Sequence, residues 1–324
     1  MPASQMISGI GFGEFKNQYN HFQSVYFSNH SIDSSEALLA DNTYFAFNDP
    51  FQLIIELGIF GFIIFFIFFI FLLKRFISDF KIDFFGNDYL KGAYMTVFCF
   101  LIGSLFSYPF QILSFLPLFI LSIVIIFKRK RGQLFMVQSK IFRLPYKVWL
   151  IYPVIAAGFV FIVLKITDAY QLSSEADQLS KAGFKKKSVS VYSRLSKNLI
   201  IDPNTYYKYA IELANLKKTD SAIIMLNKSM QYLYNDQSAT LMANLYYEKG
   251  LQNLADSFYR QAVFINPKSF RNRFDLFQFY VEMNKKSEAI YWGNSILNMP
   301  IKIASRTVVQ IKKETYNLLN QINN

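Results

Sequence analysis

Long apolar runs set the pattern of the first half of the chain. The first run covers residues 53–73, is rich in Phe and Ile, and is followed at once by Lys74 and Arg75. A helix of about 20 apolar residues matches the hydrocarbon core of a bilayer. We therefore expect a transmembrane helix here, with a polar head and a basic end.

A second apolar stretch, residues 92–127, is too long for one span. It carries no charge, and a straight helix of this length would reach about 54 Å, nearly twice the thickness of the hydrocarbon core. Pro109 interrupts it, because proline lacks an N–H and disfavours helix at the residue before it. With one more apolar run near residue 150, the pattern predicts four transmembrane helices, at about 53–73, 92–107, 110–127 and 148–164.

The C-terminal segment, residues 166–324, has a different pattern that resembles the tetratricopeptide repeat (TPR). Small residues that let two helices cross closely alternate with aromatic residues that fill gaps, and a proline ends the second helix. Weaker matches stand before and after this unit, and about three units are needed to bury a repeat core. We predict a short TPR-like α-solenoid. Its strongest unit, residues 236–269, carries Met242, Ala243, Tyr246, Gly250, Ala255, Tyr259, Ala262 and Pro267.

Residues 1–52 are expected to form a polar and aromatic loop, because neither helical nor strand periodicity extends over any length there. The run GIGFG at residues 9–13 is interpreted as a flexible turn. A phosphate cradle is the alternative, but such a loop opens a helix and usually has a lysine partner. The predicted fold is all-α, with a loop (1–52), a membrane domain (53–165) and a repeat domain (166–324).

Basic residues predict the orientation of the spans. Lys and Arg gather in the loops 74–91 and 128–147, whereas Lys16 is the only basic residue of 1–52. The positive-inside rule places both basic loops in the cytoplasm. With four spans, the N-terminal loop and the repeat domain then lie on the opposite side of the membrane.

Composition narrows the classes of function. Hydrophobic residues make up 52% of the chain and Phe occurs 36 times, as expected for membrane spans. The net charge of +12 does not predict a nucleic-acid partner, because the cations flank apolar runs or lie in the helical tail. Cys99, His21 and His30 form no ligand pattern, so we expect no metal site and no cofactor.

Two blocks of sequence resemble the O-antigen ligase/polymerase family of bacterial envelope membrane proteins. GIGFGEFKNQYNHFQSVYF (9–27) is similar to that family's glycine-rich outer loop. AFNDPFQLIIELGIFG (46–61) is similar to its loop end and Glu-Leu-Gly span entry. The resemblance covers roughly residues 5–165. It implies glycosyltransferase activity on a polyprenyl-diphosphate-linked glycan in lipopolysaccharide or other surface polysaccharide biosynthesis.

The resemblance also implies a place in the cell and a limit on activity. The chain would be a multi-pass protein of the bacterial inner membrane, with its N-terminal loop and TPR-like domain in the periplasm. Phe47 stands where the family often carries histidine, and the family's earlier spans and arginines have no counterpart. The chain is therefore expected to be the C-terminal part of such a transferase, active only when the missing spans complete it.

Candidate site residues gather at the head of the first span. Asn48, Gln52 and Glu56 recur every four residues and so share one helix face. In the functional interpretation Glu56 acts as a base, and Lys16, Asn48 and Gln52 bind the glycan carrier. In the structural interpretation Asn48 caps the helix, with an acidic residue and a proline in its first turn.

Two functions from different classes follow. One is the C-terminal part of an O-antigen ligase-like glycan transferase whose repeat domain binds a protein of the same pathway. The alternative is a non-catalytic, membrane-anchored TPR scaffold that binds a partner protein of the cell envelope.

Overall fold

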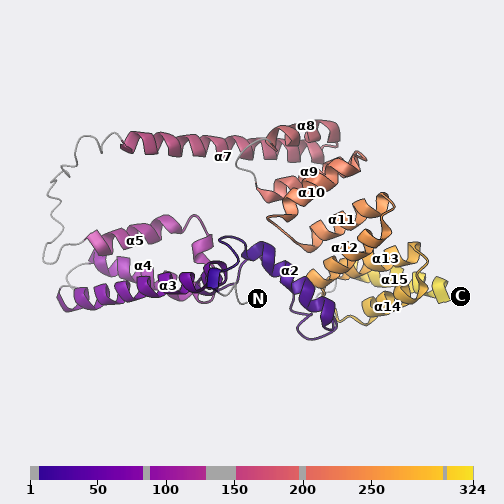
Figure 1. Cartoon of the computed structure of the whole chain (residues 1–324), viewed down its shortest axis with the longest axis horizontal. Helices are drawn as coiled ribbons and strands as arrows, with labels where there is room; N and C mark the ends of the chain where they lie inside the picture. Colours follow the sequence, from indigo (N-terminus) through magenta and orange to yellow (C-terminus); the bar gives the residue numbers. More distant parts are fainter. Residues whose placement is uncertain (1–6, 83–87, 129–150, 197–201, 302–304, 324) are drawn as a thin grey trace. The chain divides into compact units, whose positions relative to one another are not determined.

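The computed structural model describes residues 7–82, 88–128, 151–196, 202–301 and 305–323, and every regular element in these ranges is a helix (Figure 1). The all-α prediction is confirmed. The chain divides into two compact units that are each discontinuous in sequence. The apolar unit comprises Met1–Lys16 and Thr43–Trp149, and the repeat unit comprises Asn17–Asn42 and Leu150–Asn324.

Helix α3 (Asp49–Ile82) is the longest element of the apolar unit. It is followed by α4 (Asp88–Ser104), the short 3-10 turn η1 (Pro109–Gln111) and α5 (Leu116–Lys128). Leu72, Leu90 and Ile126, from three different helices, are buried together. Apolar side chains of α3 such as Phe60 and Phe71 are exposed, which is typical of a helix that meets lipid.

The expected number of spans is not found in the described residues. There, only Asp49–Phe80 is long and apolar enough to cross a membrane, and Leu116–Phe127 is a shorter apolar helix. The arms of the expected hairpin are the reason, because 17 and 13 residues rise only about 26 and 20 Å. The fourth expected span, 148–164, starts outside the described residues, and its remainder forms the first half of α7.

The repeat unit stacks helix pairs (Figure 1). We call the first helix of each pair the A helix and the second the B helix. A closing helix, α15 (Arg306–Asn323), follows the last pair. The pairs are α7 (Ile151–Lys181) with α8 (Lys185–Leu195), α9 (Pro203–Asn215) with α10 (Thr219–Met230), α11 (Asp236–Glu248) with α12 (Gln252–Ile265), and α13 (Phe270–Glu282) with α14 (Lys286–Asn298).

The turn inside each pair shows the repeat period. Gly183, Lys217, Gly250 and Asn284 all have positive φ, at intervals of 34, 33 and 34 residues. A left-handed residue commonly ends a helix and favours glycine, and 34 residues is the TPR period. Two of the four positions carry Lys and Asn instead of Gly, which is one reason why these repeats look degenerate in sequence. The predicted TPR-like domain is confirmed.

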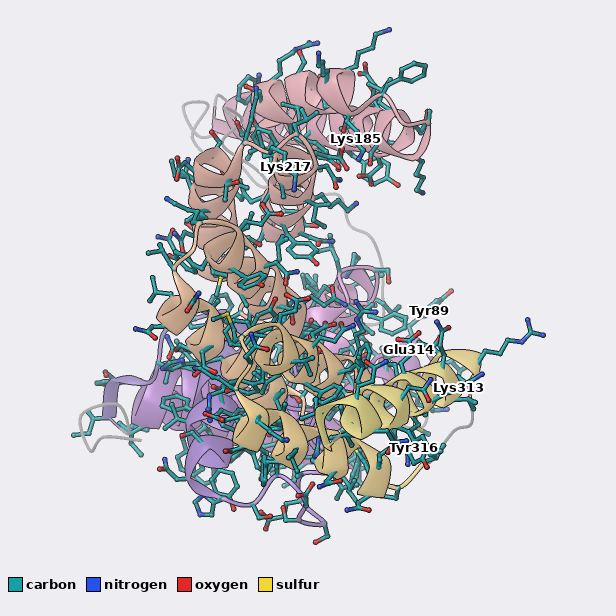
Figure 2. The ribbon with its side chains drawn as sticks, turned by 90° about the vertical axis from the view of Figure 1, so that its right-hand side faces the viewer. Tyr89, Lys185, Lys217, Lys313, Glu314 and Tyr316 are labelled. Atoms are coloured by element: carbon teal, nitrogen blue, oxygen red, sulfur yellow. The ribbon has the colours of Figure 1, made fainter. Side chains whose placement is uncertain are left out.

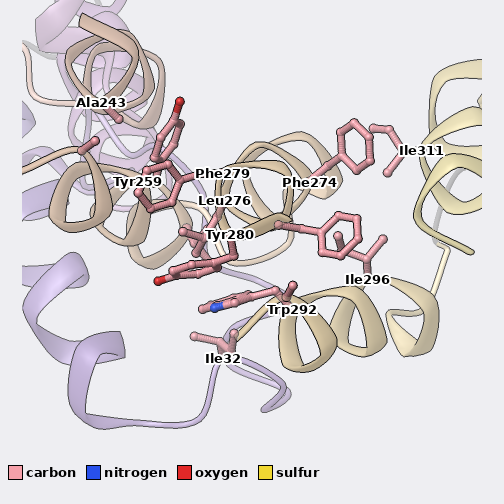
Figure 3. Close-up of a cluster of buried hydrophobic side chains, with 14 of the residues drawn as sticks. Ile32, Ala243, Tyr259, Phe274, Leu276, Phe279, Tyr280, Trp292, Ile296 and Ile311 are labelled. Carbon is pink, nitrogen blue, oxygen red and sulfur yellow. The ribbon is translucent and has the colours of Figure 1, made fainter. Parts of the chain in front are cut away.

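Close packing within the repeats rests on the small residues that the sequence pattern singled out. Ala243, Ala255 and Ala262 are fully buried. Larger side chains fill the space between successive pairs, with Tyr280 and Trp292 at the centre of one cluster (Figure 3). Ile32, from the N-terminal segment, belongs to the same cluster.

The prediction of a loop over residues 1–52 is wrong in part, because α2 (Phe15–Asn29) is a 15-residue helix. Its buried face consists of Asn20, Gln23, Ser24 and Phe27, at the spacing of one helix side. Three of these four residues are polar. The helix therefore leaves no hydrophobic periodicity in the sequence.

Amide side chains of α2 bind the turns between successive repeats. Asn20 Nδ2 donates to the carbonyl oxygen of Tyr234 at 2.8 Å. Gln23 Nε2 donates to the carbonyl oxygen of Ile265, the last residue of α12. Carbonyl groups at helix ends have no partner within their own helix. The α2 amides supply one, and this is why residues 17–42 belong to the repeat unit.

The segment after α2 is tied to the start of α11. The Asp236 carboxylate accepts hydrogen bonds from the side-chain amides of Asn42 at 2.7 Å, Asn272 at 2.9 Å and Asn266 at 3.1 Å. These residues come from the N-terminal segment and from two successive repeats. Asp236 therefore joins three parts of the repeat unit at one carboxylate.

Candidate functional site

The predicted site residues at the head of α3 are held by the glycine-rich loop. Gly58 interrupts the helix with φ 62° and ψ −147°. The backbone amides of Ile10 and Gly11 donate to the carbonyl oxygens of Ile55 and Glu56, at 3.1 and 3.0 Å. The loop amides are thus engaged by the helix and do not form a phosphate cradle.

Glu56 is buried and both of its carboxylate oxygens accept hydrogen bonds. Oε2 accepts from the backbone amide of Gly13 at 2.9 Å, and Oε1 accepts from Gln52 Nε2 at 3.0 Å. Gln52 in turn accepts from the backbone amide of Ala46 at 3.1 Å. The structure therefore brings the predicted pair Gln52 and Glu56 together, and their bonds connect three backbone segments.

Asn48 has the geometry of a helix cap. Its Oδ1 accepts from the backbone amide of Phe51 at 2.9 Å, and its Nδ2 donates to the carbonyl oxygen of Leu105 at 3.1 Å. Both ends of its amide are thus occupied by backbone groups. Lys16 lies in the first turn of α2, and takes no part in the hydrogen bonds given above for Glu56. In the described part of the chain, no group of three His, Cys, Asp or Glu side chains could hold a metal ion.

A second candidate site is a groove of about 680 Å³ in the repeat unit. Side chains of the A helices α9, α11 and α13 line it, and Tyr259 of α12 joins them. The α13 residues recur every three to four positions and so share one helix face. The lining residues used below are Tyr207, Thr240, Asn244, Tyr247, Glu248, Arg271, Asp275, Gln278 and Glu282.

Hydrogen bonds order the side chains of the groove. The Tyr259 hydroxyl donates to Asn244 Oδ1, and Arg271 Nε pairs with Asp275 Oδ1 at 2.8 Å. Thr240 Oγ1 is buried and has no hydrogen-bond partner within the described structure. The groove therefore holds at least one buried polar atom that a bound ligand could pair.

The ionisable groups of the groove respond to burial and to one another. Burial raises the pKa of the Asp275 carboxyl, while the Arg271 guanidinium opposes the shift. Burial also raises the pKa of the Tyr259 phenol, with further contributions from the negative charges of Asp275 and Glu282. A hydrogen bond to Glu282 raises the pKa of Tyr247. Negative potential is thus concentrated along α13.

Comparisons with solved structures find helical repeat proteins. MamA AMB-1 is 17% identical, with a TM-score of 0.37 over 48% of this chain and 84% of that one. MamA from Desulfovibrio magneticus RS-1 is 13% identical, with a TM-score of 0.39 over 48% and 93%. YrrB, described as a TPR protein with an unusual peptide-binding site, is 14% identical, with a TM-score of 0.35 over 47% and 84%. These likenesses concern the fold alone.

The chain matches no protein-family profile and no curated protein sequence. The resemblance to O-antigen ligases therefore gains no support from these comparisons. What is established is an all-helical protein with a TPR-like domain.

Sequence reasoning missed the groove residues, although a signal for them exists. Asn244 and Tyr247 follow directly after the small residues of the repeat signature, on the other side of the same helix. Asp275, Gln278 and Glu282 repeat that arrangement in the next A helix. Polar and aromatic residues at three-to-four spacing on the A helices thus mark the groove once the repeat frame is known.

Proposed function

We propose that this chain is a membrane-anchored TPR-like scaffold that holds a segment of a partner protein of the cell envelope. The groove of the repeat unit carries this proposal. It draws side chains from the A helices of three successive pairs, and its polar and aromatic lining suits a peptide backbone and side chains. A groove of this size can bury a short extended segment.

Anchoring rests on α3, whose apolar side chains are exposed along its length. Since residues 17–42 bind the TPR-like helices, these two parts of the chain must lie in the same compartment. The chain between them must then cross the membrane an even number of times. The four-span arrangement satisfies this condition, and so does a single pair of crossings.

We further propose that the repeat unit faces the periplasm of a bacterial cell, with the chain in the inner membrane. Lys74 and Arg75 follow the apolar part of α3, and the positive-inside rule favours the cytoplasm for them. The opposite end of α3 and the N-terminal segment then lie outside.

Photo-crosslinking from the groove tests the scaffold function. A photoreactive phenylalanine placed at Asn244 or Gln278 should form crosslinks to a discrete partner protein in intact cells. The matched control is Ile224 on the B helix α10, which is 55% exposed and does not line the groove. Equal crosslinking from Ile224, or no crosslink from either groove position, would contradict the proposed function.

Glycan transfer from a polyprenyl-diphosphate carrier is a second candidate function. The observation in its favour is the convergence of Gln52, Glu56 and the glycine-rich loop at the polar head of α3. Glu56→Gln, made in whatever assembly performs the transfer, should abolish surface-glycan assembly if the carboxylate acts as a base. Normal glycan with normal amounts of protein would leave Glu56 only its structural role.

A further inference from the structure

We infer that the groove of the repeat unit binds an extended, basic peptide segment, with Lys or Arg at every third residue. This inference rests on the proposed scaffold function and names the chemistry of its ligand. The ligand is a segment of another protein, and its cations meet Asp275 and Glu282 on α13.

Charge is the first argument. The groove is lined by three carboxylates, those of Glu248, Asp275 and Glu282, and by one guanidinium, that of Arg271. The whole chain carries a formal charge of +12, so this acidic surface runs against the composition of the protein. Complementary charge favours association with a basic segment and disfavours an acidic one.

The partners of these carboxylates decide which of them meet the ligand. Lys217, labelled in Figure 2 on the turn between α9 and α10, pairs with Glu248 at 3.1 Å. Arg271 bonds Asp275 through Oδ1 only, so Oδ2 can take a second cation. Glu282 is exposed and its neighbour Tyr247 is a neutral phenol. Asp275 and Glu282 are therefore the two groups that a basic ligand would engage.

Spacing is the second argument. Asp275 and Glu282 lie seven residues apart on one face of α13, which corresponds to about 10 Å along a helix. In a polyproline II segment, side chains on the same side recur every third residue, at about 9 Å. A ligand in this conformation thus brings a cation to each carboxylate without bending.

The rest of the lining suits such a segment. Because Asn244 Oδ1 accepts from Tyr259, the amide nitrogen of Asn244 is the group that can donate to a ligand carbonyl. The rings of Tyr207 and Tyr247 can contact the alkyl stems of Lys and Arg. Thr240 Oγ1 supplies a further hydrogen-bonding group on the floor.

Fluorescence anisotropy with the full chain in lipid nanodiscs of neutral phospholipid tests the inference. The probes are labelled nine-residue peptides made of three Lys-Pro-Pro, Glu-Pro-Pro or Gln-Pro-Pro units, together with a peptide of three lysines followed by six prolines. The variants are Asp275→Asn with Glu282→Gln, and Gln278→Trp, which fills the groove. The control is Asp220→Asn with Glu314→Gln, which removes the same charge outside the groove; Glu314 is labelled on α15 in Figure 2.

We expect the Lys-Pro-Pro peptide to bind most tightly. Neutralising Asp275 and Glu282 should weaken it about tenfold, as for two ion pairs of partly exposed groups, and Gln278→Trp should remove it. The Asp220 and Glu314 control should leave it unchanged, and clustered lysines should bind less well than spaced ones.

Several results would overturn the inference. Equal affinity for the Gln-Pro-Pro or Glu-Pro-Pro peptide, with Gln278→Trp still blocking, would reject the basic ligand and leave the scaffold function standing. The same is true if the clustered and spaced peptides bind alike. Binding that survives both groove variants would place the peptide elsewhere. If no peptide binds, the basic class is rejected, and the crosslinks from Asn244 and Gln278 decide the scaffold function separately.

Discussion

Arg273 Nη1 donates to Asp33 Oδ1 at 2.8 Å, joining two residues that are 240 positions apart in sequence. The Arg273 side chain is only 1% exposed. Its Nη2 donates to the carbonyl oxygen of Ile32, and its Nε donates to that of Pro267, each at 2.8 Å. One buried guanidinium thus holds the N-terminal segment against the turn between two repeats.

Removing this guanidinium should release the N-terminal segment. Because Arg273→Ala leaves the Ile32 and Pro267 carbonyl oxygens and Asp33 without their donor, we expect it to destabilise the repeat unit by about 3–5 kcal/mol. Limited proteolysis should then cut residues 17–42 faster than in the wild type, and thermal unfolding should report the loss of stability.

Arg271→Ala is the matched control for Arg273. The Arg271 side chain is 69% exposed and pairs only with its helical neighbour Asp275, so its loss should change stability by about 1 kcal/mol or less. If Arg273→Ala were as mild as Arg271→Ala, the buried contact with Asp33 and Ile32 would not hold the segment.

Gly9→Ala should disrupt the head of α3, whereas Gly13→Ala should not. A Cβ on Gly9 would lie 2.1 Å from the Glu56 carbonyl oxygen, and the same atom on Gly13 would meet nothing within 4 Å. Both glycines have positive φ, so each substitution carries strain of about 1–2 kcal/mol, and only Gly9 adds a backbone clash. Detergent-solubilised variants, compared by thermal unfolding, should separate in this order, and equal unfolding temperatures would contradict the close approach of the loop.

Asp275 should make the repeat unit less stable as the pH rises. Burial raises the pKa of its carboxyl above the ordinary 3.8, so the folded state favours the protonated form. Its contribution to stability is present below pH 3.8 and is lost as the pH rises through the raised pKa. Asp275→Asn removes this loss, and the variant should gain unfolding temperature relative to the wild type between pH 3.8 and neutrality.

The control for this pH series is Asp220→Asn, which removes a carboxylate whose side chain is 81% exposed. A difference between Asp275→Asn and the wild type that stays constant with pH would show that burial does not act on Asp275 in this way.

The helical class and the repeat frame could be read from the sequence, because small residues such as Ala243 and Ala262 are required wherever two helices cross closely. The capping geometry of Asn48 could also be anticipated, since it needs only local sequence. The helix α2 could not, because its buried side is made of amides such as Asn20 and Gln23. These side chains are matched to backbone carbonyls more than 200 residues away, and no local pattern records such partners.

The site was predicted at the wrong end of the argument for the same reason. Glu56 and Gln52 attracted attention as polar residues at a span entry, and the structure gives their hydrogen bonds to the loop and to each other. The groove residues, such as Asp275 and Glu282, look like ordinary solvent-facing positions until the A helices of several repeats are placed side by side.

The docking of the N-terminal segment on the TPR-like helices is the claim on which the compartment, the even number of crossings and the scaffold function all depend. Ser28 and Ser287 line one pocket between the two parts of the repeat unit. In a chain with Cys99→Ser, the double variant Ser28→Cys with Ser287→Cys should be joined by a short bifunctional maleimide in intact membranes. Ser28→Cys with Ser221→Cys, a pair outside this pocket, should not be joined. Two cysteines that are labelled only from opposite sides of the membrane, with no crosslink between them, would contradict the account.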